Sequence, residues 1–94
     1  MGKSILQDEK RCYFCGNTAN LEKHHIYFAA LRNTSERNGF VVWLCCKCHR
    51  DNKYGVHGNR EMDLQLKREC QAKYEESHSR TEWLDLIGRN YLED

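Results

Sequence analysis

Residues 12–26 read CYFCGNTANLEKHHI and place two cysteines ahead of a histidine doublet. Residues 43–49, WLCCKCH, then bring a second close pair of cysteines and another histidine. The chain has 94 residues, of which 39% are hydrophobic, so its core is thin. Because domains this small gain much of their stability from a metal or disulfide staple, we expect these cysteines to decide the fold of one domain, residues 1–94.

The cysteines form two Cys-x-x-Cys pairs separated by 29 residues, a distance that a hairpin can close. Four thiolates at such a spacing bind zinc tetrahedrally, so the predicted ligands of a structural Zn²⁺ are Cys12, Cys15, Cys45 and Cys48. Free buried thiols that pair only in sequence are the alternative. Cys46 and Cys70 fall outside both pairs, and we expect them to be bystanders.

Six cysteines can also indicate a secreted disulfide framework. The amino-terminal segment MGKSILQDEK is charged, however, and lacks the apolar centre of a secretion signal. No stretch approaches the roughly 18 apolar residues of a membrane span, so no membrane partner is expected. These features favour metal-binding thiols in a reducing cytoplasm.

The charges are distributed unevenly along the chain. Residues 1–60 carry ten Lys or Arg against five acidic residues, whereas residues 61–94 carry five against nine. A cationic portion suits a polyanionic partner such as nucleic acid, and a mixed solvated surface explains the same counts equally well. The charge therefore permits a nucleic-acid partner without requiring one.

Hydrophobic patterning predicts a small α+β fold. We expect a strand over residues 21–27, a long polar loop over 28–39, a buried strand over 40–44 and a short helix over 46–53. The sequence GVHGN at residues 55–59 separates this core, residues 1–58, from a helical extension, residues 59–94. Two helices of the extension are expected to pack over the core.

Capping signals mark both helices of the extension. Asn59 is a predicted N-cap for a helix that runs to about Ser77. Its apolar side chains recur every four residues and should face the core: Met62, Leu66, Cys70 and Tyr74. Ser79 and Glu82 predict a capping box for a last helix that carries Trp83, Leu84 and Ile87 and ends at Gly88.

Four of the five histidines lie close to the cysteine pairs in sequence: His24, His25, His49 and His57. Folding of the zinc site would draw His49 towards the strand that carries the doublet, which creates a second candidate metal centre. Adjacent side chains on a strand point to opposite faces, so His24 and His25 are assigned different roles. Surface or hydrogen-bonded structural imidazoles are the alternative.

The combination of C-x-x-C, LEKHHI and WLCCKCH resembles the HNH endonuclease family. The resemblance covers residues 12 to about 57 and implies a zinc-stapled ββα-metal motif, followed here by two C-terminal helices. The tail SRTEWLDLIGRNYL, residues 79–92, also resembles that of small HNH proteins encoded by bacteriophages. A phage origin would place the protein in the cytoplasm of a bacterial host cell.

By position in the family pattern, the resemblance implies that His24 is a metal ligand and His25 the general base. His49 becomes the second ligand. The family commonly has its last ligand four residues further on, but Lys53 stands there and is unsuitable. His57 is favoured for this role over Asn52, because imidazole binds most transition metals better than a neutral amide does.

The asparagine of the family name also departs from the pattern. Its usual position, five residues before the first cysteine of the second pair, holds Phe40 in this chain. Asn38 is the nearest substitute for the side chain that holds the loop orienting the base. An ordinary Asn-Gly turn accounts for Asn38 equally well.

The resemblance and these residues together predict a metal-dependent DNA endonuclease. His25 would accept a proton from water, and a divalent ion on the other histidines would stabilise the leaving oxygen. Imidazole ligands favour Mn²⁺, Co²⁺, Ni²⁺ or Zn²⁺, and Mg²⁺ is an abundant alternative. Basic side chains around the short helix are candidates for phosphate contacts: Lys47, Arg50 and Lys53. The competing hypotheses are a zinc-ribbon module that binds nucleic acid or protein without cutting, and a purely structural zinc protein.

Overall fold

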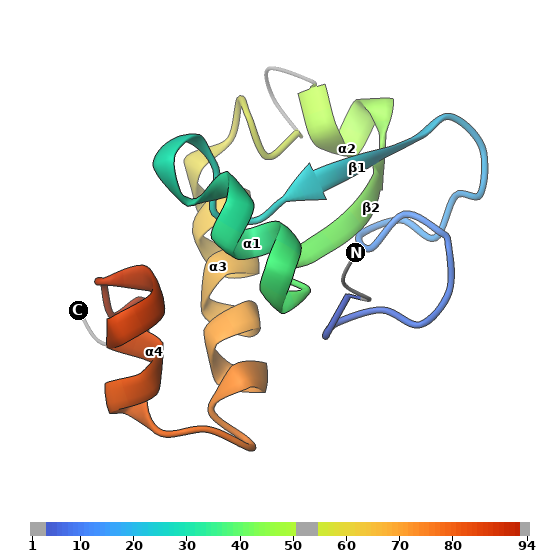
Figure 1. The fold of residues 1–94 in the computed structure, drawn as a ribbon. Coiled ribbons are helices and arrows are strands. Elements are labelled where there is room, and N and C mark those ends of the chain that lie inside the picture. Colours follow the sequence, from blue (N-terminus) through green and yellow to red (C-terminus); the bar gives the residue numbers. More distant parts are fainter. Residues whose placement is uncertain (1–3, 51–54, 93–94) are drawn as a thin grey trace.

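The computed structural model describes residues 4–50 and 55–92. Its sheet consists of two antiparallel strands, β1 (Leu21–His25) and β2 (Val41–Cys45), and the helices lie around it (Figure 1). The register sets Leu21 opposite Cys45 and His25 opposite Val41. The carboxyl end of β1, with its histidines, therefore lies opposite the start of β2, whereas Cys45 lies at the far end of the sheet.

The segment between the strands is helical, so the prediction of a long polar loop over residues 28–39 is wrong. A 3₁₀ turn, η1 (Ala29–Leu31), leads into helix α1 (Arg32–Asn38), which ends at Gly39 in the left-handed conformation. No side chain caps the start of α1. Instead, the buried Ser35 hydroxyl donates to the Tyr27 carbonyl oxygen at 2.6 Å and accepts from the Tyr27 amide at 3.1 Å. This tertiary contact fixes a helix that local sequence signals do not predict.

The same contact explains why β1 stops earlier than predicted. The backbone of Tyr27 pairs with the Ser35 side chain, while the Ile26 amide still donates to the Phe40 carbonyl at 2.9 Å. Helix α2 (Cys46–Arg50) follows β2 directly. The rest of the predicted helix, residues 51–53, lies outside the described residues.

Both C-terminal helices begin where the capping signals predict. In α3 (Arg60–Tyr74), the Asn59 side chain accepts hydrogen bonds from two backbone amides of the first turn. In α4 (Arg80–Ile87), Ser79 and Glu82 form the predicted capping box, and Gly88 ends the helix in the left-handed conformation. Helix α3 ends three residues before Ser77, so its predicted end is slightly too late.

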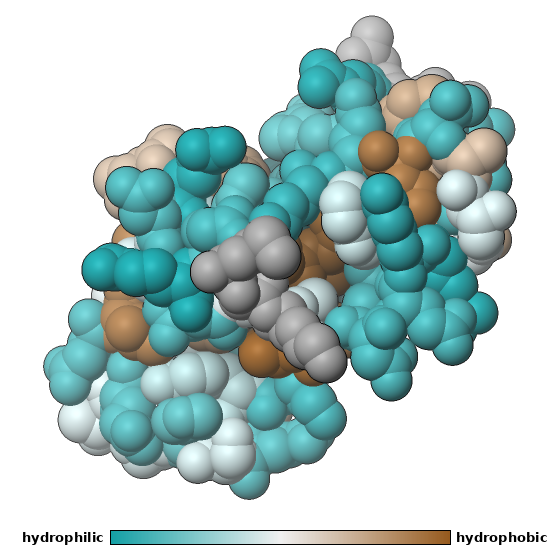
Figure 2. All heavy atoms as spheres, turned by 45° about the vertical axis from the view of Figure 1, so that its right-hand side comes forward, coloured by the Kyte–Doolittle hydropathy of each residue, from teal (hydrophilic) through white to brown (hydrophobic). Residues whose placement is uncertain are grey.

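The hydrophobic core joins the sheet to these helices. Trp83 of α4 is fully buried, and its ring centroid lies 5.3 Å from that of Tyr27 and 5.4 Å from that of Phe40. The predicted stripe of α3 packs here, with Leu66 and Cys70 buried. The exposed Leu84 is the exception among the apolar residues expected on α4. Because the core takes most large apolar side chains, one face of the molecule is mostly hydrophilic with small apolar patches (Figure 2).

Among the described residues, no helix has both the length and the apolar character needed to cross a membrane.

Candidate metal centres

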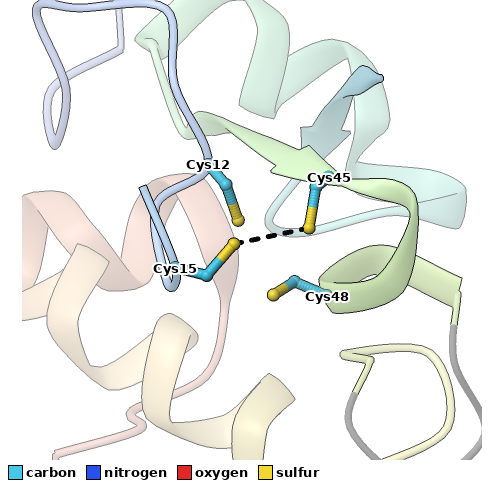
Figure 3. Close-up of side chains that lie close together, drawn as sticks. All are labelled: Cys12, Cys15, Cys45 and Cys48. Atoms are coloured by element: carbon cyan, nitrogen blue, oxygen red, sulfur yellow. Dashed lines mark hydrogen bonds between the residues drawn. The ribbon is translucent and has the colours of Figure 1, made fainter. Parts of the chain in front are cut away.

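The two Cys-x-x-Cys pairs come together at one end of the sheet. The sulfur atoms of Cys12, Cys15, Cys45 and Cys48 all lie within 4.8 Å of one another. Figure 3 shows the four side chains pointing towards a common centre. The sulfur atoms of Cys15 and Cys45 are 3.5 Å apart. This arrangement is close enough to hold one metal ion and is consistent with structural zinc.

Backbone hydrogen bonds hold the first pair of cysteines in place. The Gly16 amide donates to the Cys12 carbonyl at 2.9 Å, and Gly16 has a φ of 79°, which glycine adopts without strain. The Tyr13 amide donates to the Trp43 carbonyl of β2 at 2.8 Å. The turn bearing Cys12 and Cys15 is therefore attached to the strand that ends at Cys45.

The surroundings of the thiols favour ionisation of one member of the group. Burial raises the pKa of Cys12, but hydrogen bonds from the backbone of Cys45 and Cys15 outweigh it and lower the pKa to about 6. Burial and contacts with the neighbouring thiols raise the pKa of Cys48. Because a bound cation stabilises thiolates, a zinc ion would allow all four cysteines to ionise.

Three histidines form a second group near the other end of β1. Ligand nitrogens of His24, His49 and His57 lie within 4.8 Å of one another. Their ring centroids are 5.1 Å apart for His24 and His49, 5.3 Å for His24 and His57, and 4.6 Å for His49 and His57. The structure thus brings together the three histidines that sequence analysis assigned to the second metal.

The return of the chain after α2 explains the position of His57. The Val56 amide donates to the Cys48 carbonyl at 2.9 Å, and the His57 amide donates to the His49 carbonyl at 3.3 Å. These two bonds lay residues 56–57 against the end of α2. His57 consequently reaches His49 although eight residues separate them in sequence.

The ring nitrogens of this group face one another. The Nε2 atoms of His49 and His57 are 3.0 Å apart, a separation that a metal ion between them would widen. His24 is 2% exposed, and its Nε2 has no hydrogen-bond partner among the described residues. Burial, and then the proximity of His49 and His57, lowers the pKa of His24 to about 3. A neutral, buried nitrogen without a partner suits a metal ligand.

A carboxylate contacts the second ring nitrogen of one of these histidines, His49. The Oε1 atom of Glu22 lies 2.7 Å from His49 Nδ1 and accepts from Arg50 Nε at 2.9 Å. These bonds lower the pKa of Glu22. A carboxylate on the outer nitrogen of a metal-binding imidazole fixes the ring and leaves Nε2 for the ion. Sequence analysis missed Glu22, although it lies two residues before His24 on the same strand, a spacing that puts both on one face.

His25 lies outside the three-histidine group but lines the same cleft. The cleft has a volume of about 390 Å³, and its lining includes cationic side chains as well as imidazoles: Lys23, His24, His25, Phe28, Arg32, Glu36, His49 and His57. His25 Nε2 lies 2.8 Å from Glu36 Oε1. The two members of the doublet therefore have different surroundings, as strand alternation led us to expect. Glu36 is a second residue that sequence analysis missed, because its segment was expected to be a loop.

The remaining predicted site residues lie elsewhere. Asn38 is the last residue of α1, and its side-chain amide donates to the Thr34 carbonyl at 2.8 Å, so it does not reach the cleft. Asn52 and Lys53 lie outside the described residues. Cys46 is exposed on α2, and Cys70 is buried in α3.

Comparisons with protein-family models, curated proteins and solved structures give no match to this chain.

Proposed function

We propose that this protein is a metal-dependent DNA endonuclease of the HNH type. One observation carries the proposal. Three imidazoles gather within 4.8 Å, and a fourth, His25, lines the cleft that they share. A zinc-ribbon module that only binds its partner needs the cysteines but has no use for this second group.

In this proposal the four cysteines hold a structural zinc, and the histidine group forms the second centre of a ββα-metal motif. The order of elements supports it, because β1 carries His24 and α2 carries His49. The adjacent residues Cys48 and His49 belong to different groups. One short helix, α2, would therefore carry a ligand of the structural zinc, Cys48, and a ligand of the second metal, His49.

The reaction we infer is hydrolysis of a phosphodiester bond. His25 does not belong to the three-histidine group and is free to take the proton of a water molecule that attacks phosphorus. A divalent ion held by His24, His49 and His57 would supply positive charge to a phosphate oxygen and to the leaving 3′ oxygen. The resemblance to HNH enzymes implies products with 5′-phosphate and 3′-hydroxyl ends.

Side chains at the cleft are suited to hold the DNA backbone. Its lining includes Lys23 and the exposed Arg32. Contacts from these cations to phosphates would position the substrate without reading its bases. The all-imidazole ligand set favours Mn²⁺, Co²⁺, Ni²⁺ or Zn²⁺, with Mg²⁺ as the abundant alternative in cells.

Cleavage of supercoiled plasmid under each of these metals tests the proposal. Wild-type protein should nick or linearise the DNA, and His25→Ala should reduce the rate by about 100- to 10,000-fold, the usual contribution of a general base. His78→Ala is the matched control, because His78 is exposed and stacks on Tyr74 away from the cleft. Absence of cleavage under every metal, or equal cleavage by the His25 variant, would refute the nuclease in favour of a binding module.

A further inference from the structure

Among the described residues, Glu36 is the one acidic side chain that lines the cleft. It projects from α1 and makes two contacts there: its Oε1 atom lies 2.8 Å from His25 Nε2, and its Oε2 atom accepts from Lys23 Nζ at 2.9 Å. The side chain of His25 is 12% exposed and that of Glu36 is 33% exposed, so the pair is partly shielded from water. Neither contact is needed for a metal site, which leaves the role of Glu36 to be explained.

We propose that Glu36 is a positioning residue that holds the base, His25, with its proton on Nε2 and its free electron pair on Nδ1. This inference rests on the proposed nuclease function. The Nδ1 atom would then be the one that takes a proton from the attacking water. Glu36 touches neither substrate nor metal in this scheme and acts only through His25.

The chemistry of the pair fixes the direction of the hydrogen bond. An ionised carboxylate only accepts hydrogen bonds, so the imidazole nitrogen that faces it must carry the proton. Hydrogen bonds from His25 and then Lys23 lower the pKa of Glu36 to about 2, which keeps this carboxylate ionised at neutral pH. A neutral His25 therefore donates from Nε2 and has Nδ1 available as an acceptor.

The backbone around Glu36 is well suited to this task. Its neighbour Ser35 is fully buried and is bonded to both backbone groups of Tyr27. The Ser35 carbonyl also accepts from the Phe40 amide at 2.9 Å. These bonds attach the middle of α1 to the chain just beyond β1, and thus fix the position of Glu36 relative to His25.

The sequence did not show which side chain contacts His25 and orients it. The position of the family asparagine holds Phe40, which is fully buried, and Asn38 bonds within its own helix. Neither residue orients His25 through a contact of its side chain in the described structure. A carboxylate from α1 supplies that contact instead.

Two substitutions test the role, each measured by DNA cleavage and by the ¹⁵N chemical shifts of the His25 ring at a pH above the range in which ordinary imidazoles titrate. Glu36→Ala removes the acceptor, and kcat should fall about 10- to 100-fold with little change in KM. The His25 shifts should move from the pattern of a proton on Nε2 towards a mixture of tautomers.

Glu36→Gln should be the more damaging substitution. Lys23 only donates hydrogen bonds, so the new amide should turn its oxygen towards Lys23 and its NH₂ group towards His25. His25 must then accept at Nε2 and carry its proton on Nδ1, which is the wrong tautomer for the base. We expect kcat to fall by roughly 100-fold or more, as loss of the correct tautomer costs other enzymes.

Adding Lys23→Met to Glu36→Gln should recover part of kcat, because the amide is then free to turn its oxygen to His25. Since Lys23 is also proposed to contact phosphates, kcat is measured at saturating DNA and compared with that of Lys23→Met alone. Glu76→Gln is the control, since Glu76 also pairs with a lysine, Lys73, at 3.1 Å but lies just beyond the carboxyl end of α3 and outside the cleft lining. Its kcat should equal that of the wild type.

The outcomes separate this inference from the proposed function. Wild-type kcat in Glu36→Ala, or a wild-type His25 with its proton on Nδ1, would overturn the role of Glu36 and leave the nuclease in place. A wild-type protein that cuts no DNA would overturn the nuclease and this role with it.

Discussion

The cysteine group and the histidine group share helix α2 but differ in what surrounds them. The cysteine group has four ligand atoms of its own and a turn that is hydrogen-bonded to β2. The histidine group has three ligand nitrogens and lines a cleft of about 390 Å³ together with a fourth imidazole and two cationic side chains. Four protein ligands close a metal site, whereas three leave a position for water or substrate.

This difference assigns a separate role to each group in our account. Cys12 and Cys45 belong to the core, so loss of a metal there should destabilise the whole fold. The histidine group contributes a buried nitrogen, His24 Nε2, that has no partner in the described part of the chain, and the group lines an open cleft. Loss of a metal there should affect chemistry and leave most of the packing unchanged.

The largest effect is expected from Cys48→Ser. Zinc binding is coupled to folding by about 10 kcal/mol or more in small zinc domains, which exceeds the stability that a thin core supplies. We expect loss of stoichiometric zinc and of most cooperative unfolding, measured by metal analysis and circular dichroism. A zinc-free variant that stays folded would remove the distinction between the two groups.

His49→Ala should produce the next largest effect, and on a different property. The fold and the structural zinc should persist. Loss of a residue that is hydrogen-bonded to a metal ligand typically costs roughly 10- to 100-fold in metal affinity, and loss of the ligand itself should lower the affinity for the second metal by more than that. Excess metal should partly restore cleavage. Titration calorimetry with Mn²⁺ measures the affinity, and an unchanged value would exclude His49 as a ligand.

Glu22→Gln should lower the affinity for the second metal less, by about 10- to 100-fold. It removes the carboxylate that contacts His49 Nδ1 but keeps all three ligands. Glu9→Gln is the control, since Glu9 is exposed and pairs only weakly with Arg11 at 3.7 Å. If both variants bind Mn²⁺ equally well, Glu22 serves only to pair with Arg50.

Cys46→Ser should have the smallest effect. Cys46 lies between two members of the cysteine group in sequence, but its side chain is exposed and outside the group. The variant should retain one equivalent of zinc and the unfolding temperature of the wild type. Loss of zinc would show that the ligand set differs from the one assigned by spacing.

Local signals predicted the parts of the fold that local chemistry controls. The Asn59 cap and the Ser79–Glu82 capping box depend on atoms within one helical turn, so their residues could be recognised in the sequence. The two Cys-x-x-Cys pairs were equally recognisable, because ligand spacing reflects the geometry of the site.

Helix α1 and the two supporting carboxylates depend on contacts between distant residues. The Ser35 bonds to Tyr27 stabilise α1 without any capping residue in its sequence. Glu36 reaches His25 only because that helix forms. His57 could be proposed from the chemistry of imidazole, but its approach to His49 depends on the hydrogen bonds of residues 56–57 to the end of α2.

Titration of metal-free protein with Co²⁺, with DNA cleavage followed at each step, tests the division of roles between the two groups most directly. The first equivalent should bind the thiolates, give the intense thiolate-to-cobalt absorption and restore the fold without cleavage. The second equivalent should add only weak bands of nitrogen ligation, and cleavage should begin with it. Full cleavage after the first equivalent, or saturation at one equivalent without cleavage, would contradict a structural metal on the cysteines and a reacting metal on the histidines.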